Sequence, residues 1–390
     1  SLPHLDERAA IKGMSPVVEE GKASQGTAQR KCCTCCTVRV ALIATAAVAV
    51  FILLVYLFPL QAVVANGLAA ARDCNARKDG NTPEAYFTRA DFQEICPRYG
   101  NVDLKDYFFD DDEYETVSFP SRSGDVQELS GYWFEVKKGA PVVIVSHGFA
   151  ACKDRYEMLL PARMLTRNGY NVFAYDQRNH GRSASTDPAY LTAGVKERDD
   201  LLGAIDYVID ELKFKPSRVG LYGVSLGGAV TVLGLGLEPR ISSGVFLDSP
   251  AYQIRVAVSN LLPSWSIPAL VVHFWETYFI GEDIDEITPK AALEATAASN
   301  SKKPLFKVVS STTDQTVRFE DNGAVLIQDA WALGFEVDSK LWNTEGPFEW
   351  GSNTFEARPT GEGCNEHLTF MLVNPSRYEQ TLIEFFDRAF

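Results

Sequence analysis

The chain has 390 residues, of which 46% are hydrophobic, 11% aromatic and 23% charged, as in an ordinary globular protein. Its 28 glycines and 19 prolines are too few for a collagen-like or low-complexity chain. Its formal net charge of −14 disfavours nucleic-acid binding, which needs a basic surface to displace counterions.

The first element expected along the chain is a membrane-spanning helix at residues 40–64. This segment is almost wholly apolar, and the nearest charged residues are Arg39 before it and Arg72 after it. Such a helix is roughly 38 Å long, which suffices to cross a ~30 Å hydrocarbon core with some tilt. A buried core helix would show a polar stripe, which is missing here. A cleaved signal peptide, with residues 69–71 at its cleavage site, is the alternative.

Residues 1–39 are expected to form a cytosolic tail, because basic residues such as Arg39 next to a span favour the cytosolic side. A cysteine cluster lies just before the span, at Cys32, Cys33, Cys35 and Cys36. These cysteines are either palmitoylated at the membrane or unmodified. A zinc site is disfavoured, because four thiolates so close in sequence cannot surround a metal ion without strain.

Four further cysteines follow the span, at Cys74, Cys96, Cys152 and Cys364. An even number of cysteines fits two disulfides in an oxidising compartment. We therefore expect a single-pass membrane protein whose larger part lies in the lumen of an organelle or outside the cell.

Residues 65–113 are expected to form a stalk and an N-terminal extension, and residues 114–390 a folded α/β domain. The domain starts with a β-hairpin at 116–122 and 128–136. Apolar runs typical of strands buried on both faces follow at 141–147, 171–176, 218–223, 244–248 and 305–310. Helical patterns occur at 155–168, at 195–212, from Leu226 onward and at the C-terminus. This alternation predicts a mostly parallel sheet with helices on both faces.

Residues 223–227, Gly-Val-Ser-Leu-Gly, form a G-x-S-x-G motif between an expected strand and an expected helix. A sharp turn there exposes the Ser225 hydroxyl at the helix N-terminus, and the flanking glycines avoid steric clashes. The N–H of Leu226 lies in the first helical turn, where amides lack intrahelical partners, so it is free to stabilise an oxyanion. The motif indicates a nucleophilic serine.

A serine hydroxyl needs a base to become a good nucleophile, and the chain has five histidines. Four are disfavoured by their position or surroundings: His4, His147, His180 and His273. His367 follows the last expected strand, and a hydrolase of this topology places its base after the nucleophile. His367 is therefore the expected base.

The acid that orients this histidine should follow a strand between Ser225 and His367. Asp314 lies four residues beyond the strand expected at 305–310, where a short loop would carry its carboxylate over the sheet edge. Asp248 ends the preceding strand and is the rival. Asp314 is preferred, and Asp248 is expected to have a structural or helix-capping role.

A second oxyanion donor is expected in the loop that follows the strand at 141–147. Gly148 lets the backbone approach the reacting carbonyl closely, which makes the N–H of Phe149, or that of Ala150, the expected donor. His147 is expected to brace this loop.

These motifs together resemble the α/β-hydrolase superfamily, and within it the esterases and serine-aminopeptidase-like hydrolases with little or no cap domain. The segments that carry the resemblance are SHGF at 146–149, YDQRNHGRS at 175–183, GVSLGG at 223–228 and FLDSP at 246–250, with Asp314 and His367. The resemblance covers residues 114–390. It implies an eight-stranded, mostly parallel sheet, a triad of Ser225, Asp314 and His367, and the backbone amides of Phe149 and Leu226 as oxyanion donors.

Three features outside these motifs bear on the site that the resemblance implies. In such a fold the loops of Cys152 and Cys364 reach the same sheet edge, which favours Cys152–Cys364 and Cys74–Cys96 disulfides. The long stretch at 344–366, with Phe348, Trp350 and Phe355, is expected to overhang the site. The apolar segment at 264–280 either lines an acyl pocket or belongs to the core.

The sequence thus predicts a membrane-anchored serine hydrolase that cleaves an ester, thioester or amide through an acyl-enzyme. The expected substrate is a small-molecule or lipid-like acyl compound, the lipid bilayer is contacted through residues 40–64, and no metal or cofactor is called for. Two alternatives remain open: a serine peptidase of the same fold, and a catalytically idle binding protein built on it.

Overall fold

The structure is a computed structural model that describes residues 37–51, 105–187, 189–261, 286–300, 302–311, 314–343, 349–350, 353–354, 356–357, 367–368 and 370–390. The strands are β1 Glu115–Phe119, β2 Leu129–Phe134, β3 Val142–Ser146, β4 Asn171–Tyr175, β5 Val219–Val224, β6 Gly244–Asp248, β7 Leu305–Ser311, β8 Val337–Asn343, β9 Glu349–Trp350, β10 Asn353–Thr354 and β11 Glu356–Ala357. The helices are α4 Tyr156–Arg167, α5 Glu197–Asp206, α6 Leu226–Leu235, α7 Ile254–Leu261, α9 Pro289–Ser299, α10 Gly323–Ala332, α11 Phe370–Val373 and α12 Pro375–Ala389. Short turns of other helical types are η3 Lys105–Tyr107, η4 Tyr207–Glu211 and η5 Pro216–Arg218.

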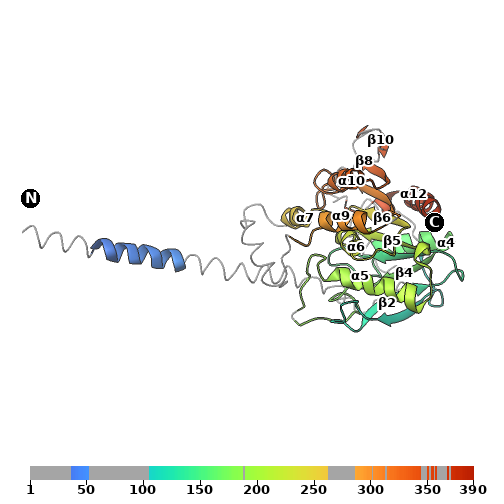
Figure 1. Ribbon diagram of the computed structural model, residues 1–390, viewed down its shortest axis with the longest axis horizontal. Coiled ribbons are helices and arrows are strands. Elements are labelled where there is room, and N and C mark those ends of the chain that lie inside the picture. Colours follow the sequence, from blue (N-terminus) through green and yellow to red (C-terminus); the bar gives the residue numbers. More distant parts are fainter. Residues whose placement is uncertain are drawn as a thin grey trace, which may run out of the picture. The chain divides into compact units, whose positions relative to one another are not determined.

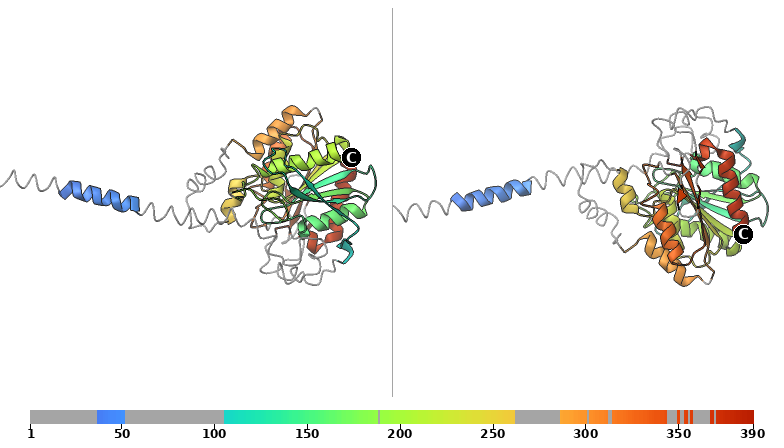
Figure 2. Two further views of the ribbon diagram at one scale, coloured as in Figure 1. Left: turned by 90° about the horizontal axis from the view of Figure 1, so that it is seen from below. Right: turned by 90° about the horizontal axis from the view of Figure 1, so that it is seen from above.

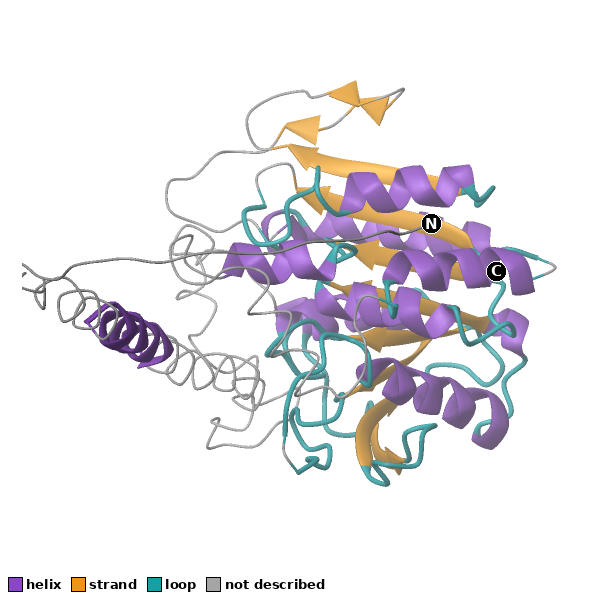
Figure 3. Ribbon diagram, turned by 60° about the vertical axis from the view of Figure 1, so that its left-hand side comes forward, coloured by secondary structure: helices purple, strands orange, loops and turns teal. Residues whose placement is uncertain are grey.

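One sheet dominates the part of the chain that the structure describes. Its strand order is β1-β2-β4-β3-β5-β6-β7-β8-β11 (Figures 1 and 3). The pairs β1–β2 and β2–β4 are antiparallel, and all other neighbours are parallel. Because β5, β6 and β7 run side by side in the same direction, the segments that follow them all start at the edge of the sheet formed by the carboxyl ends of these strands.

Helices cover both faces of this sheet (Figure 2). Helices α5, α6, α9 and α10 share one apolar core with the strands, and helices α4, α11 and α12 share the other. The central strands β3 and β5 are buried along their whole length, as their uninterrupted apolar sequence requires. Two packed layers therefore hold the carboxyl ends of the central strands in fixed positions.

The expected α/β architecture is confirmed, including the hairpin and the parallel strands that follow it. The expected sheet of eight strands is present, and the two-residue strand β11 adds a ninth within the described residues. The sequence pattern did not reveal β8, in which polar and apolar residues are interspersed. The helix expected at 195–212 divides into α5 and the π-helical turn η4.

Residues 37–51 form a helix whose large apolar side chains are exposed, with Phe51 at 67%. In the ranges that the structure describes, no helix is both long enough and apolar enough to span a membrane. Residues 52–64 of the expected span lie outside those ranges, as do the cysteine cluster and most of the expected stalk.

Candidate active site

Ser225 lies at the turn between strand β5 and helix α6. Its backbone has φ 52° and ψ −122°, in the region of positive φ that residues with a side chain rarely adopt. Three backbone hydrogen bonds hold this conformation. The Ser225 N–H donates to the Asp248 carbonyl at 2.9 Å, and the Ser225 carbonyl accepts from Gly228 at 3.0 Å and Ala251 at 2.9 Å. The turn is therefore strained and fixed by its neighbours, as expected for a nucleophile presented at a helix N-terminus.

Close backbone approach explains two of the glycines around this turn. A Cβ on Gly227 would lie 2.2 Å from the Ser146 carbonyl oxygen, so α6 packs directly against the end of β3. A Cβ on Gly148 would lie 3.0 Å from Ser225 Cβ and 3.5 Å from Ser225 Oγ. The loop after β3 therefore lies against the serine side chain, at the place expected of an oxyanion loop.

His367 and Asp314 are in direct contact, although 53 residues separate them in sequence. The His367 Nδ1 to Asp314 Oδ2 distance is 2.6 Å, and both side chains are largely buried, 15% and 0% exposed. The other carboxylate oxygen, Oδ1, accepts from the backbone N–H groups of Thr316 and Val317, each at 2.8 Å. These bonds fix the carboxylate, and a carboxylate acceptor places the histidine proton on Nδ1.

The electrostatic surroundings of His367 favour its protonated form. Burial alone lowers the pKa of His367, but the carboxylates of Asp314 and Asp248 outweigh burial and raise that pKa above its ordinary value of 6.5. A histidine held in this way accepts a proton readily when a neighbouring hydroxyl attacks.

The rival carboxyl, Asp248, has a different partner. Tyr378 from helix α12 donates its hydroxyl to Asp248 Oδ2 at 2.6 Å, and the Ser249 hydroxyl donates to Oδ1 at 3.2 Å. Burial raises the pKa of Asp248 to about 6, against the opposing effect of the Tyr378 hydrogen bond. The structure therefore joins His367 to Asp314, and it ties Asp248 to the C-terminal helix.

His147 braces the loop after β3 in the way expected from the sequence. Its Nε2 accepts from the Gln177 backbone N–H at 3.0 Å, and its Nδ1 lies 2.9 Å from the Gly148 carbonyl oxygen. The Gln177 side chain in turn donates to the His147 carbonyl at 2.7 Å. Burial lowers the pKa of His147 to about 3, so the ring is neutral and donates from Nδ1.

The two expected oxyanion donors adjoin Ser225 and Gly148 in the chain. Leu226 is the first residue of α6, and Phe149 follows Gly148 in the loop after β3. The Phe149 side chain is 40% exposed, and the next residue, Ala150, has a positive φ of 51°. The positive φ of Ala150 turns the chain sharply just after Phe149. The assignment of both amides as oxyanion donors stays a prediction.

A buried ion pair near this loop was not anticipated from the sequence. Lys153 Nζ contacts Asp176 Oδ2, and both side chains are fully buried. The same carboxylate accepts from the backbone N–H groups of Lys153 at 2.8 Å and Arg182 at 2.9 Å. The pair joins the loops that follow β3 and β4. In the sequence, the only sign of this ion pair is a charged residue within a few positions after each of two buried strands.

Several expectations fall outside the described residues. They concern the apolar segment at 264–280, the cysteines at 74, 96 and 364, and the side chains of the stretch at 344–366. Cys152 is buried and disulfide-bonded, and every other cysteine of the chain lies outside the described ranges. The Cys152–Cys364 pairing therefore stays a prediction.

The chain resembles known proteins in both sequence and fold. A family model described as serine aminopeptidase, S33, matches residues 137–314, which include Ser225 and end at Asp314. The esterase Pf2001 of Pyrococcus furiosus has a similar structure, with a TM-score of 0.52 and 23% identity over 74% of this chain and 96% of the esterase. Residues 137–314 thus match a family of α/β-hydrolases, and the fold of the described residues is the α/β-hydrolase fold.

Curated proteins similar in sequence to this chain include a thiohydrolase and a monoglyceride lipase. The thiohydrolase aneE of Aspergillus aculeatus is 28% identical over 130 residues, which are 33% of this chain and 39% of the relative. The monoglyceride lipase of Homo sapiens is 34% identical over 119 residues, which are 30% of this chain and 38% of the relative. The matches thus span well under half the length of these two relatives.

Proposed function

We propose that this α/β-hydrolase is a serine hydrolase that cleaves carboxylic esters or thioesters through an acyl-enzyme. The observation that carries the proposal is the 2.6 Å contact between His367 Nδ1 and Asp314 Oδ2, at the sheet edge where Ser225 is held in a strained turn. The names of the similar lipase and thiohydrolase favour ester and thioester substrates over amides.

The first half of the proposed reaction forms the acyl-enzyme. Because Nδ1 of His367 donates to Asp314, Nε2 carries a lone pair and can accept the Ser225 hydroxyl proton. The serine oxygen attacks the substrate carbonyl, and the backbone N–H groups of Phe149 and Leu226 stabilise the developing oxyanion. His367 then returns its proton to the leaving alcohol or thiol as the bond to the carbonyl carbon breaks.

Water completes the reaction by the same steps in reverse order. His367 takes a proton from water, and the hydroxide attacks the acyl carbonyl. Collapse of the second tetrahedral intermediate releases the carboxylic acid, and Ser225 regains its proton from His367. Asp314 stabilises the imidazolium in both halves, so the cycle needs only side chains, backbone amides and water.

A fluorophosphonate probe tests this proposal, because it reacts only with a serine that has been made nucleophilic. We expect the wild-type protein to be labelled and to hydrolyse p-nitrophenyl esters, and the Ser225→Ala variant to do neither. Ser249→Ala is the matched control, since Ser249 is a buried serine that follows the neighbouring strand, and it should keep the label. A folded wild type that takes no label would favour the idle binding protein.

We further propose that residues 40–64 anchor the protein in a membrane, with the hydrolase domain in the lumen or outside the cell. Two observations favour this: the exposed apolar side chains of the helix at residues 37–51, and the disulfide at Cys152, which fits an oxidising compartment. We expect the full chain to stay in the membrane pellet during alkaline carbonate extraction. Protease added to sealed vesicles should spare the hydrolase domain, and release by carbonate would contradict the anchor.

A further inference from the structure

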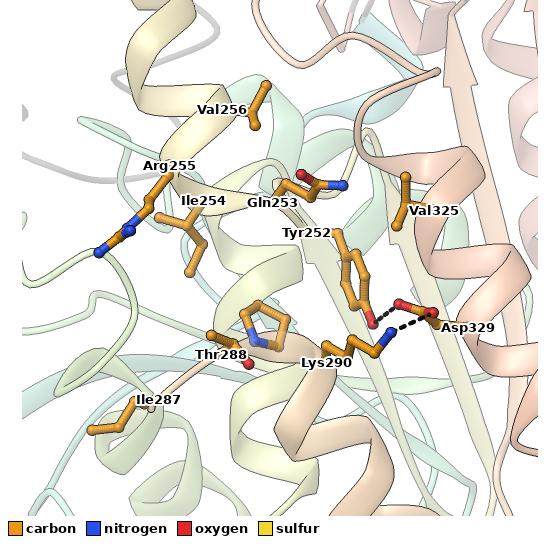
Figure 4. Close-up of a pocket in the computed structure, with 11 residues that line it drawn as sticks. Tyr252, Gln253, Ile254, Arg255, Val256, Ile287, Thr288, Lys290, Val325 and Asp329 are labelled. Carbon is orange, nitrogen blue, oxygen red and sulfur yellow. Dashed lines mark hydrogen bonds and ion pairs between the residues drawn. The ribbon is translucent and has the colours of Figure 1, made fainter. Parts of the chain in front are cut away.

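A pocket of about 390 Å³ lies between helices α7, α9 and α10 (Figure 4). It is lined by the segments in which α7 and α9 begin and by two residues of α10, Val325 and Asp329. The proposed reaction assigns no role to this pocket.

One end of the pocket is polar. Asp329 accepts a hydrogen bond from the Tyr252 hydroxyl at 2.9 Å, and its other oxygen lies 3.1 Å from Lys290 Nζ (Figure 4). Both oxygens of the carboxylate are therefore engaged. An ammonium group has three N–H donors, so Lys290, whose side chain is 59% exposed, retains donors for a ligand.

The other end of the pocket has the apolar side chains of Ile254 and Ile287, with Arg255 beside Ile254, and it lies next to the proposed active site. Ile254 lines the pocket and also packs against a small cluster formed by Leu191, Leu226 and Ala229. Leu226 is the proposed oxyanion residue, so a single side chain separates its cluster from the pocket. In Figure 4, Ile254 and Ile287 lie away from the Tyr252–Asp329–Lys290 group.

Helix α7, which forms one wall, is also packed against the loop of the proposed acid. Ala257 of α7 belongs to an apolar cluster with Ala251 and Val317. The Val317 backbone N–H donates to Asp314 at 2.8 Å. The pocket wall and the catalytic residues therefore share one supporting structure, which keeps the pocket at a fixed position relative to Ser225.

We propose that this pocket binds the far end of the acyl chain, and that the preferred substrate is an ester of an acyl group that ends in a carboxylate. This inference rests on the proposed function. The apolar residues suit the methylene groups next to the scissile carbonyl, and Lys290 suits an anion at the far end. The Lys290 ammonium donates to Asp329 and keeps N–H donors beyond that bond, which a carboxylate at the far end of the chain can accept.

Matched pairs of p-nitrophenyl esters test the proposal. One member of each pair has an acyl chain that ends in a methyl group, and the other has a chain of equal length that ends in a carboxylate. The measured quantity is the ratio of kcat/KM for the carboxylate-ended ester to kcat/KM for the neutral ester. We expect the wild-type ratio to exceed one at the chain length that reaches Lys290.

The Lys290→Met variant should lower this ratio about tenfold, because it removes one charge-assisted hydrogen bond to a partly exposed group. Lys302→Met is the matched control, since Lys302 is exposed, lies beyond the end of α9 and changes the net charge equally. It should leave both esters unaffected. Val325→Trp, which narrows the pocket from α10, should slow long-chain esters of both kinds relative to the acetate ester.

The outcomes separate this inference from the function on which it rests. If the wild type hydrolyses neutral esters but the ratio is below one, or is the same in Lys290→Met, then the carboxylate-binding role is wrong and the hydrolase stands. A wild type that prefers amine-ended esters would equally overturn it. If no ester is hydrolysed and no fluorophosphonate label is taken up, the proposed function itself fails and this inference fails with it.

Discussion

At the scale of single residues, the proposed site depends on which carboxylate contacts His367. Two buried aspartates lie at the carboxyl ends of neighbouring strands, and the charges of both raise the pKa of His367. Asp314 is hydrogen-bonded to the ring, at 2.6 Å, whereas Asp248 is bonded to Tyr378 and Ser249. The two carboxyls should therefore respond differently to the same substitution.

Asp314→Asn should lower kcat by about 10⁴-fold, because the amide no longer holds the imidazole in the required tautomer. The remaining activity should also change its pH dependence. The neutral form of His367 is the base, so kcat/KM rises with pH through the pKa of this residue. Removing the carboxylate lowers that pKa, and the acidic limb should move to lower pH. The measurement is a pH profile of kcat/KM for an acetate ester.

Asp248→Asn is the matched control for this experiment. It removes a second, more weakly acting carboxylate, so the acidic limb should move slightly in the same direction while most of kcat is retained. A larger loss of kcat in Asp248→Asn than in Asp314→Asn would reverse the assignment of the acid.

Asp248 should also make the stability of the fold depend on pH. Its pKa in the folded protein is about 6, above the ordinary value of 3.8. A carboxyl with a raised folded-state pKa stabilises the fold at low pH, and this contribution disappears as the pH rises through about 6. The difference between these two pKa values corresponds to about 3 kcal/mol of folding free energy, since one pKa unit is worth about 1.4 kcal/mol.

Urea unfolding of the wild type and of Asp248→Asn at a series of pH values measures this effect. We expect the free energy of unfolding of the wild type, relative to the variant, to fall by up to about 3 kcal/mol between pH 4 and pH 7. Asp200, whose buried carboxyl also has a pKa of about 6, is present in both proteins, so its contribution cancels. A difference that is constant with pH would show that Asp248 is ionised throughout.

At the scale of elements, the β5–α6 turn is where sequence and structure agree most closely. The G-x-S-x-G motif predicted a strand that ends before Ser225 and a helix that begins at Leu226, and the structure has both boundaries there. The glycines of the motif carry this signal, because a glycine is needed where one backbone segment packs directly against another. A Cβ on Gly227 would overlap a carbonyl oxygen of β3.

Substitutions at two glycines near Ser225 should distinguish effects on the stability of the fold from effects on catalysis. Gly227→Ala places a Cβ 2.2 Å from the Ser146 carbonyl oxygen, which belongs to rigid backbone, so we expect a loss of about 3 kcal/mol of stability. Gly148→Ala meets Ser225 Cβ at 3.0 Å, where a shift of a few tenths of an ångström relieves the contact.

Gly148→Ala should therefore remain folded but lose kcat by about ten- to hundredfold, because the oxyanion loop is displaced from the serine. Thermal unfolding and ester hydrolysis of both variants provide the comparison. If Gly148→Ala keeps full activity at an unchanged melting temperature, the loop after β3 does not supply an oxyanion donor.

Other elements were harder to predict, for physical reasons that differ from case to case. Strand β8 has neither an apolar run nor a clean alternation, because only the two-residue strand β11 lies beyond it in the sheet. The π-helical turn η4 continues the apolar pattern of α5, so hydrophobic spacing does not reveal the change in hydrogen bonding. The Lys153–Asp176 pair joins two loops, and local sequence gives no measure of the distance between them.

At the scale of the whole molecule, buried charges link the loops at the carboxyl edge of the sheet. Asp176 is the centre of one such link, between the loops after β3 and β4. Burial raises the pKa of Asp176, but Lys153 outweighs burial and holds that pKa below its ordinary value. The carboxylate is therefore ionised at neutral pH, and the lysine offsets the free-energy cost of burying this charge.

Lys153→Met should destabilise the fold by about 3–5 kcal/mol at pH 7, because it leaves a fully buried carboxylate without its cation. Adding Asp176→Asn should restore much of this loss, since the charge that lacks a partner is then removed. Lys307→Met is the matched control. Its partner, Asp338, has a side chain that is 40% exposed and can be hydrated, so we expect a loss of about 1 kcal/mol or less.

The three variants are compared by urea unfolding at pH 7, and the difference between the two lysines is the decisive quantity. Both substitutions replace an ammonium group by a thioether on a side chain of similar length, so they differ mainly in how well water can reach the remaining carboxylate. Equal losses would mean that burial of Asp176 does not control the result, and that hydration or the backbone N–H donors already stabilise its charge. A much larger loss at Lys153, relieved in the double variant, would mean that one desolvated ion pair helps to hold the loop after β3 at the sheet edge.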